Sequence, residues 1–185
     1  MLIYARFAAL ILTALSLGLS FAHVLEMPAK LAYPPDLYLA LQNSLYVAFG
    51  PPNVGAFVEP AAILAVVSLG YLVRRRRRAL WLTVGSTACL LLALPVVFFI
   101  YTEPASTFFR AAHLTSLPAD FEAYRRQWEY SHAARFVLHA AGFALLALSV
   151  LIRPRAAHSE LSPFTGGAIQ TQRERSYSSP SPSPY

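Results

Sequence analysis

Apolar residues gather in four long stretches, each close to the length needed to cross a membrane. A spanning helix requires about 20 predominantly apolar residues. The four stretches cover residues 2–24, 54–73, 79–101 and 131–152. The pattern therefore predicts an all-α fold, in which residues 1–152 form an antiparallel four-helix transmembrane bundle.

A shorter segment in the first long loop is predicted to form an interfacial helix. Residues 37–49 follow two prolines and Asp36, a plausible helix cap, and a Gly-Pro-Pro run ends the segment. Thirteen residues are too few to span the bilayer. Four of them share one helix face: Tyr38, Gln42, Leu45 and Phe49. Two interpretations stay open, a lid over polar residues or surface anchoring by Tyr38 and Tyr46.

Composition and charge support a membrane protein rather than a nucleic-acid-binding one. Hydrophobic residues make up 56% of the chain and charged residues only 13%, whereas a soluble domain has about 25% charged residues. The formal net charge is +6, but five arginines form one run, Arg74–Arg78, between two apolar stretches. This placement favours membrane lipid as the partner, no nucleic acid, and argues against a nuclear-localisation signal.

The positions of lysine and arginine also predict an orientation. Basic residues are in excess in the loop 74–78 and after residue 152, but not in the other two connections. Excess positive charge marks the cytoplasmic side, so both termini are expected to be cytoplasmic in an integral, multi-pass protein of the plasma membrane. The first stretch also fits a cleaved signal peptide, with small residues before His23; the topology is the same either way.

Two further features bear on the organisation of the chain. Residues 153–185 are rich in serine and proline and are predicted to be a disordered cytoplasmic tail. Cys89 is the only cysteine, so the chain has no intramolecular disulfide. No zinc-type cysteine spacing occurs, and His132 and His139 are two turns apart on one helix, so no metal site is predicted.

Ionisable residues begin the fourth apolar stretch, in QWEYSHAARFVLHAAG (127–142). Spacings of four, three, four and three residues place five of its residues on one stripe of a helix: Trp128, His132, Arg135, His139 and Gly142. Glu129 lies one turn before His132, close enough for a hydrogen bond. Trp128 suits either the interfacial aromatic belt or a pocket wall. This helix is expected to begin near Pro118 and to project above the membrane.

The first stretch carries a comparable polar stripe of Thr13, Ser16, Ser20 and His23. Small and polar residues let membrane helices approach closely and form hydrogen bonds. In an antiparallel bundle the outer ends would bring together the ionisable residues of all four stretches: His23, Glu26, Glu59, Glu103, Glu129, His132, Arg135 and His139. Because isolated charges at membrane depth cost at least about 2.5–3.5 kcal/mol each, these groups are expected to pair inside the bundle.

The chain also resembles a known family. FAHVLEMPAKL near the end of the first stretch, LQNSLYVAFG, Glu59 and RRQWEYSHAARF are similar to the anthrone-oxygenase-like family of small four-helix membrane proteins, many of them classed only as a domain of unknown function. The resemblance covers roughly residues 1–152 and rests mainly on the order Trp128, His132, Arg135. One departure is YTEPAST after the third stretch, where family members commonly have a Pro-Val-Asn type of sequence.

The resemblance implies a reaction in which dioxygen oxidises a lipophilic anthrone without a cofactor. His132 would be the base, oriented by Glu129 or Glu26, and Arg135 would stabilise the anionic oxygen. His23 is the alternative base. The remaining candidates would contact the lipophilic small-molecule substrate: Trp128, Gln42, Tyr46, Glu59 and His139.

Three functions are thus compatible with the sequence. The polar cluster is a structural ion network in a membrane protein of unassigned biochemical role, the site of a membrane oxygenase, or a haem site of an electron-transfer subunit. In the haem hypothesis His23 would be one axial ligand and His132 or His139 the other. A transporter is disfavoured because the chain has no pair of Gly/Pro-interrupted spans.

Overall fold

The computed structural model describes residues 1–49, 53–112 and 118–152 of the 185-residue chain. The predicted disorder of residues 153–185 concerns a segment outside the described residues.

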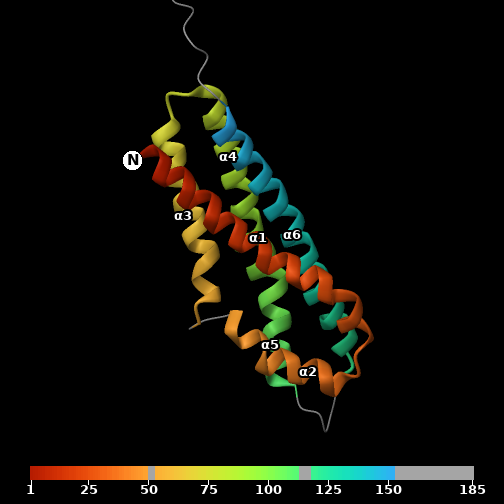
Figure 1. Ribbon diagram of the computed structural model, residues 1–185. Helices are drawn as coiled ribbons and strands as arrows, with labels where there is room; N and C mark the ends of the chain where they lie inside the picture. Colours follow the sequence, from red (N-terminus) through yellow and green to blue (C-terminus); the bar gives the residue numbers. More distant parts are fainter. Residues whose placement is uncertain (50–52, 113–117, 153–185) are drawn as a thin grey trace, which may run out of the picture. The chain divides into compact units, whose positions relative to one another are not determined.

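Helices account for nearly all of the described chain (Figure 1). In chain order they are α1 Leu2–Ala32, α2 Pro35–Ser44, the 3-10 helix η1 Tyr46–Phe49, α3 Gly55–Val73, α4 Arg77–Leu91, the π-helix η2 Leu92–Thr102, α5 Glu103–Ala111 and α6 Phe121–Leu151. Four continuous helical segments are long and apolar enough to cross a membrane: α1, α3, the run Arg77–Ala111 and α6. The chain is therefore an integral membrane protein, as predicted.

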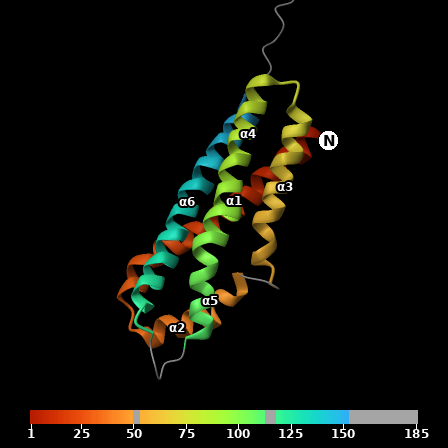
Figure 2. The same ribbon diagram turned by 180° about the vertical axis from the view of Figure 1, so that it is seen from behind.

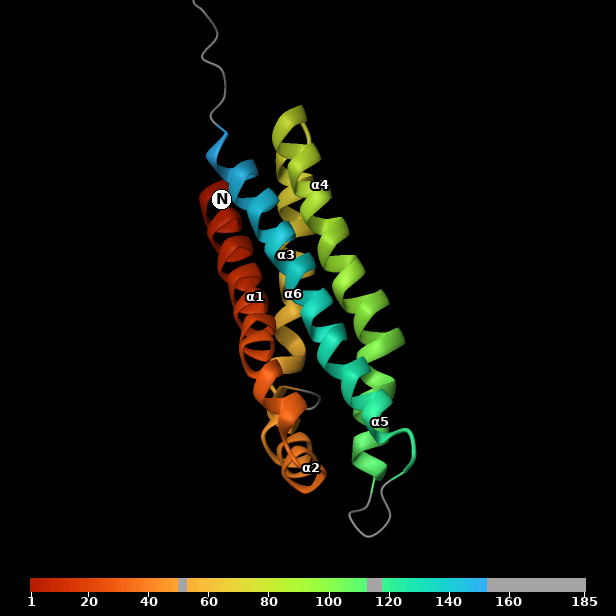
Figure 3. The same cartoon turned by 90° about the vertical axis from the view of Figure 1, so that its right-hand side faces the viewer.

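The four spans form a closed antiparallel bundle. Each packs against two others, so that α1 lies between α3 and α6, and α4 also lies between α3 and α6. The first residues of α1, the turn between α3 and α4 and the last residues of α6 lie at one end (Figures 1 and 3). The short helices α2 and α5 lie at the other end, as Figure 2 shows from behind. The predicted fold class is confirmed.

Three helices extend beyond their apolar stretches. α1 continues through Glu26 and Pro28 to Ala32, and the third span continues to Ala111. α6 starts at Phe121, ten residues before its apolar stretch and close to the predicted start near Pro118. The apolar pattern defines only the part of a helix that can lie in hydrocarbon. Beyond that part, polar residues continue these helices because their side chains find partners on neighbouring helices.

Two apolar clusters occupy opposite ends of the bundle. Near the α3–α4 turn the cluster contains Ala9, Val66, Leu69, Val73, Ala79, Leu90 and Leu146. At the other end Tyr38, Leu39, Ala105, Phe109, Phe121 and Trp128 pack together. Close approach of α6 to α4 depends on Gly142, where an added Cβ would lie 3.3 Å from the Cβ of Cys89. The polar stripes lie between the two clusters.

The end near the α3–α4 turn contains buried polar contacts besides its apolar cluster. Thr83 and Ser149 share a hydrogen bond of 2.8 Å between their hydroxyl oxygens, and the Ser149 hydroxyl also lies 3.0 Å from the carbonyl oxygen of Ala79. The hydropathy pattern misses these bonds because neutral hydroxyl groups lower the hydropathy of a stretch only slightly. They tie α4 to α6 without bringing a charge into the membrane.

Candidate functional site

A cavity of about 680 Å³ lies in the half of the bundle that carries α2 and α5. This volume is within the range of about 300–1,000 Å³ that ligand sites occupy. Its walls come from α1, α2, η1, α3, η2, α5 and α6. The lining includes eight of the ten predicted site residues: His23, Gln42, Tyr46, Glu59, Trp128, His132, Arg135 and His139.

Two stacked histidines form part of the cavity wall. The ring centroids of His23 on α1 and His132 on α6 are 3.9 Å apart. The rings of Trp128 and Tyr46 pack against His23, with centroids 5.0 Å away in each case. Both imidazoles are buried, and no described residue forms a hydrogen bond with Nδ1 of either ring. The polar stripes of α1 and α6 thus meet where the sequence predicted, at His23 and His132.

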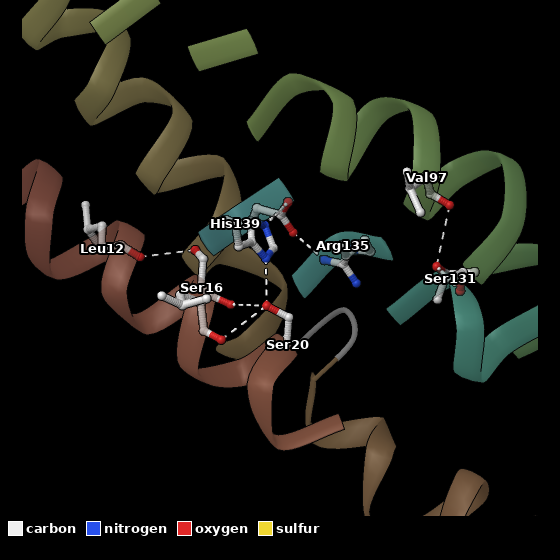
Figure 4. Close-up of polar contacts among 10 residues, drawn as sticks. Leu12, Ser16, Ser20, Val97, Ser131, Arg135 and His139 are labelled. Atoms are coloured by element: carbon white, nitrogen blue, oxygen red, sulfur yellow. Dashed lines mark hydrogen bonds and ion pairs between the residues drawn. The ribbon is translucent and has the colours of Figure 1, made fainter. Parts of the chain in front are cut away.

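Glu59 on α3 joins two residues of α6 through its carboxylate. One oxygen accepts a hydrogen bond from the Arg135 guanidinium, and the other lies 2.8 Å from Nε2 of His139. Nδ1 of His139 lies 2.7 Å from the hydroxyl of Ser20 on α1 (Figure 4). Both nitrogens of His139 therefore have partners, and the chain of contacts connects α1, α3 and α6.

Lys30 forms a second polar group, between α1 and α6. Its side chain is only 2% exposed, and its ammonium lies 3.1 Å from Glu129 and 3.6 Å from Glu26. The same ammonium faces the rings of Trp128 and Tyr46, 4.5 Å and 4.8 Å from their centroids. We call Lys30, Glu26 and Glu129 the lysine clasp.

Two tyrosines of the loop segment complete the lysine clasp. The hydroxyl of Tyr38 donates to Glu129 at 3.2 Å, and that of Tyr46 donates to Glu26. Burial, together with the neighbouring carboxylates, raises the pKa of both hydroxyls above the ordinary tyrosine value. Both tyrosines therefore remain protonated at neutral pH and act as hydrogen-bond donors.

Arg125 ties the start of α6 to the end of α1. Its guanidinium donates to the carbonyl oxygens of Leu31 at 3.3 Å and Tyr33 at 2.9 Å. It also lies over the ring of Tyr38, 4.7 Å from the centroid. The last carbonyls of a helix have no partner within the helix, so a cation at this position supplies both a donor and a favourable charge.

The structure decides between the interpretations of the loop helix and of Trp128. Tyr38 is fully buried and Gln42 is 7% exposed, so this segment covers the polar residues, and surface anchoring by Tyr38 is wrong. Trp128 is 3% exposed, and its indole N–H donates to the hydroxyl of Ser106 at 3.1 Å. It is a residue of the cavity wall and not of an interfacial belt.

Two predicted contacts are wrong. Glu129 faces Lys30 and Tyr38, and no hydrogen bond joins it to His132 within the described chain. The i to i+3 spacing allows that bond, but the buried ammonium of Lys30 is a stronger partner. Glu103 does not join the buried cluster either, because it forms a half-exposed ion pair of 2.7 Å with Arg110 on α5.

The geometry argues against the haem hypothesis. An iron with two axial imidazoles lies between them, together with the porphyrin, but the rings of His23 and His132 are in van der Waals contact. His139 already uses both ring nitrogens. Within residues 1–49, 53–112 and 118–152, no group of three or more His, Cys, Asp or Glu side chains could hold a metal ion.

Sequence reasoning missed Lys30 and Arg125 as site residues. Lys30 continues the stripe of Ser16, Ser20 and His23 at helical spacing, since it lies seven residues after His23. Extending α1 past Pro28 would have found it. Arg125 continues the stripe of α6 in the same way, since it lies three residues before Trp128, but the sequence does not show that its partners are backbone carbonyls of another helix.

Comparison with protein-family models, with curated proteins and with solved structures finds no match to this chain.

Proposed function

We propose that this protein is a membrane oxidoreductase that binds a lipophilic ring compound in the cavity and oxidises it with dioxygen. The observation that carries the proposal is the stacked pair His23–His132, because both rings line the cavity. The resemblance of the sequence to the anthrone-oxygenase-like family supports the reaction class and the absence of a cofactor.

The histidine pair is suited to act as a base. Two imidazolium charges 3.9 Å apart would repel each other by about 4 kcal/mol at an effective dielectric constant of about 20. At least one ring of the pair is therefore neutral and can accept a proton from an acidic C–H or O–H group of a bound ligand. We assign His132 as this base and His23 as its alternative.

The proposed reaction converts a ring CH₂ group to a carbonyl. The base removes one proton, and the resulting carbanion adds dioxygen and a proton to give a hydroperoxide. Loss of the second C–H proton and cleavage of the O–O bond then release water. One oxygen atom ends in the carbonyl and the other in water, so the four electrons lost by carbon reduce one dioxygen.

The other residues receive supporting roles. Arg135 lines the cavity and its side chain is 12% exposed, so its guanidinium can donate to the anionic oxygen of the ligand. Glu59 and His139 hold Arg135 in place. Glu26 and Glu129 belong to the lysine clasp and act as structural groups rather than in orienting His132.

The test uses the purified protein in nanodiscs with a hydroxylated anthrone, measured by dioxygen uptake and quinone absorbance. His132→Ala is expected to lower the rate at least a hundredfold, because general-base catalysis contributes roughly 10²–10⁴-fold, and added imidazole is expected to restore part of it. Ser149→Ala, which removes a distant buried hydroxyl, is the matched control. Activity of His132→Ala and His23→Ala equal to that of the control would overturn the proposal.

The orientation in the membrane is part of the same proposal. Arg74–Arg78 are all exposed, and they lie at the end of the bundle opposite α2 and α5. The positive-inside rule assigns this arginine run to the cytoplasm. The cavity then lies in the outer half of the plasma membrane, with both ends of the chain in the cytoplasm.

A further inference from the structure

The rim of the cavity reaches the surface of the bundle at two levels. Among its lining residues, Asn43, Asn53 and Arg110 are exposed near α2 and α5. Phe99 on η2 also lines the cavity and is 60% exposed. It precedes Arg110 by eleven residues, about 16 Å along a helix axis. The cavity lining thus includes exposed residues both at the polar end of the bundle and in the lipid-facing part of a membrane span.

The walls of the cavity differ in polarity. α6 and α3 contribute His132, Arg135, His139 and Glu59, whereas η2 contributes Leu94, Phe98 and Phe99. A ligand in this cavity therefore meets hydrogen-bonding groups on one side and hydrocarbon on the other. Such a division favours an amphipathic ligand over a uniformly apolar one.

The apolar wall of the cavity lies on a side of the bundle where neighbouring helices make few contacts. α3 packs extensively against α1 and α4, but it makes no comparable contact with η2. η2 is π-helical and contains Pro95, which has no backbone N–H to donate. Figure 3 shows α3 and the η2–α5 segment diverging toward the end that carries α2.

The charges around the cavity are balanced. Arg135 is paired with Glu59, and Arg110 with Glu103. No unpaired cation of the described cavity lining is therefore available for a phosphate or carboxylate headgroup. The polar part of the ligand is expected to be uncharged.

We propose that the natural ligand is a tailed lipid, with a neutral hydroxylated ring at the histidine pair and an aliphatic chain that leaves the cavity between α3 and η2 into the bilayer. This inference rests on the proposed function and adds the substrate class and the route of access. The ring enters sideways from the membrane, and the tail stays in contact with lipid beside Leu94 and Phe99. A ring compound without a tail also fits, because binding of the ring does not require the opening between α3 and η2 to be filled.

The experiment compares two hydroxylated ring ligands in nanodiscs, one without a tail and one with a twelve-carbon chain that carries a diazirine at its middle. Affinities are expressed as mole fraction in the bilayer, which removes the effect of partitioning. The two ligands are expected to bind within about threefold of each other. After illumination, the diazirine is expected to label η2 or α3, including Phe98 or Phe99, as read by peptide mass spectrometry. Labels in α2 or η1, or a loss of affinity of tenfold or more with the tail, would overturn the inference.

A matched pair of variants tests the opening itself. Leu94→Trp narrows it and is expected to weaken binding of the tailed ligand about tenfold more than binding of the tailless ligand. Leu64→Trp is the control, because Leu64 on α3 is 68% exposed and is not among the lining residues. Equal effects of Leu94→Trp on both ligands would contradict the proposed route.

The same measurements separate this inference from the proposed function. Loss of binding of both ligands in His132→Ala supports the histidine pair as the ring site. If the tailed ligand labels η2 but its binding does not depend on His132, the proposed lateral route stands. The assignment of the ring to the histidine pair is then wrong. If neither ligand binds, both proposals fail.

Discussion

The lysine clasp shows how single residues can stabilise charge inside this protein. Lys30 is almost fully buried, yet two carboxylates and two aromatic faces surround its ammonium. Glu129, 1% exposed, depends on the same contact. Removing one partner of a buried ion pair leaves the other charge uncompensated, which costs far more than the pair contributes while intact.

Lys30→Met is expected to lower the free energy of unfolding by about 3–5 kcal/mol, because it leaves Glu129 buried without its cation. Arg110→Met removes a cation from the half-exposed pair with Glu103 and is expected to cost less than about 1 kcal/mol. Denaturant unfolding in detergent micelles measures both. Adding Glu129→Gln to Lys30→Met should recover part of the loss. Equal costs for the two single variants would show that the clasp is not effectively buried.

The residue pattern predicted which side chains share a helix face but not which partners they choose. The stripe from Trp128 to His139 and the stripe from Thr13 to His23 are both buried, apart from the partly exposed Arg135, and they meet at the histidine pair. Which side chains pair depends on how far each helix is shifted along the bundle axis relative to its neighbours. A single sequence does not show this shift. The sequence therefore suggested that Glu129 pairs with His132, whereas in the structure Glu129 pairs with Lys30 of α1.

At the scale of helices, hydropathy located the four spans but did not show how far three of the helices continue beyond their apolar runs. The predicted span 54–73 agrees with α3 to within one residue, because both of its ends coincide with the apolar run. α1 and α6 continue for several turns beyond their apolar runs, and contacts between the two helices hold these extensions. Arg125 is one such contact, since it binds the carbonyl oxygens at the end of α1.

Arg125→Gln is expected to loosen the last turn of α1 and the start of α2. Without the guanidinium, two carbonyl oxygens lose their charged donor, a loss of about 1–3 kcal/mol. Hydrogen exchange of the amides from Lys30 to Leu39 should become about tenfold faster, which corresponds to about 1.4 kcal/mol. Arg126→Gln is the matched control, because the neighbouring Arg126 is exposed. Unchanged exchange in Arg125→Gln would show that packing alone holds this helix end.

At the scale of the whole molecule, the two ends of the bundle have different chemistry. The exposed arginines Arg74–Arg78 lie at one end, while the cavity and the lysine clasp lie toward the other. Between the ends, the large exposed side chains of the spans, such as Phe7, Leu64 and Leu148, are apolar and suited to lipid. The ionisable residues of α6 thus enter the membrane without facing hydrocarbon, because α1 and α3 supply their partners.

This polarity makes the orientation of the bundle measurable. With Cys89 replaced by serine, one cysteine is introduced either at Asp36, exposed on α2, or at Arg76, in the turn between α3 and α4. A maleimide that cannot cross membranes is applied to intact cells. Because the arginine run should stay in the cytoplasm, Asp36→Cys is expected to react at once, and Arg76→Cys only after the membrane is permeabilised. The reverse order of labelling would place the cavity in the cytoplasmic half and overturn the proposed orientation, while the lateral route between α3 and η2 would stand in either case.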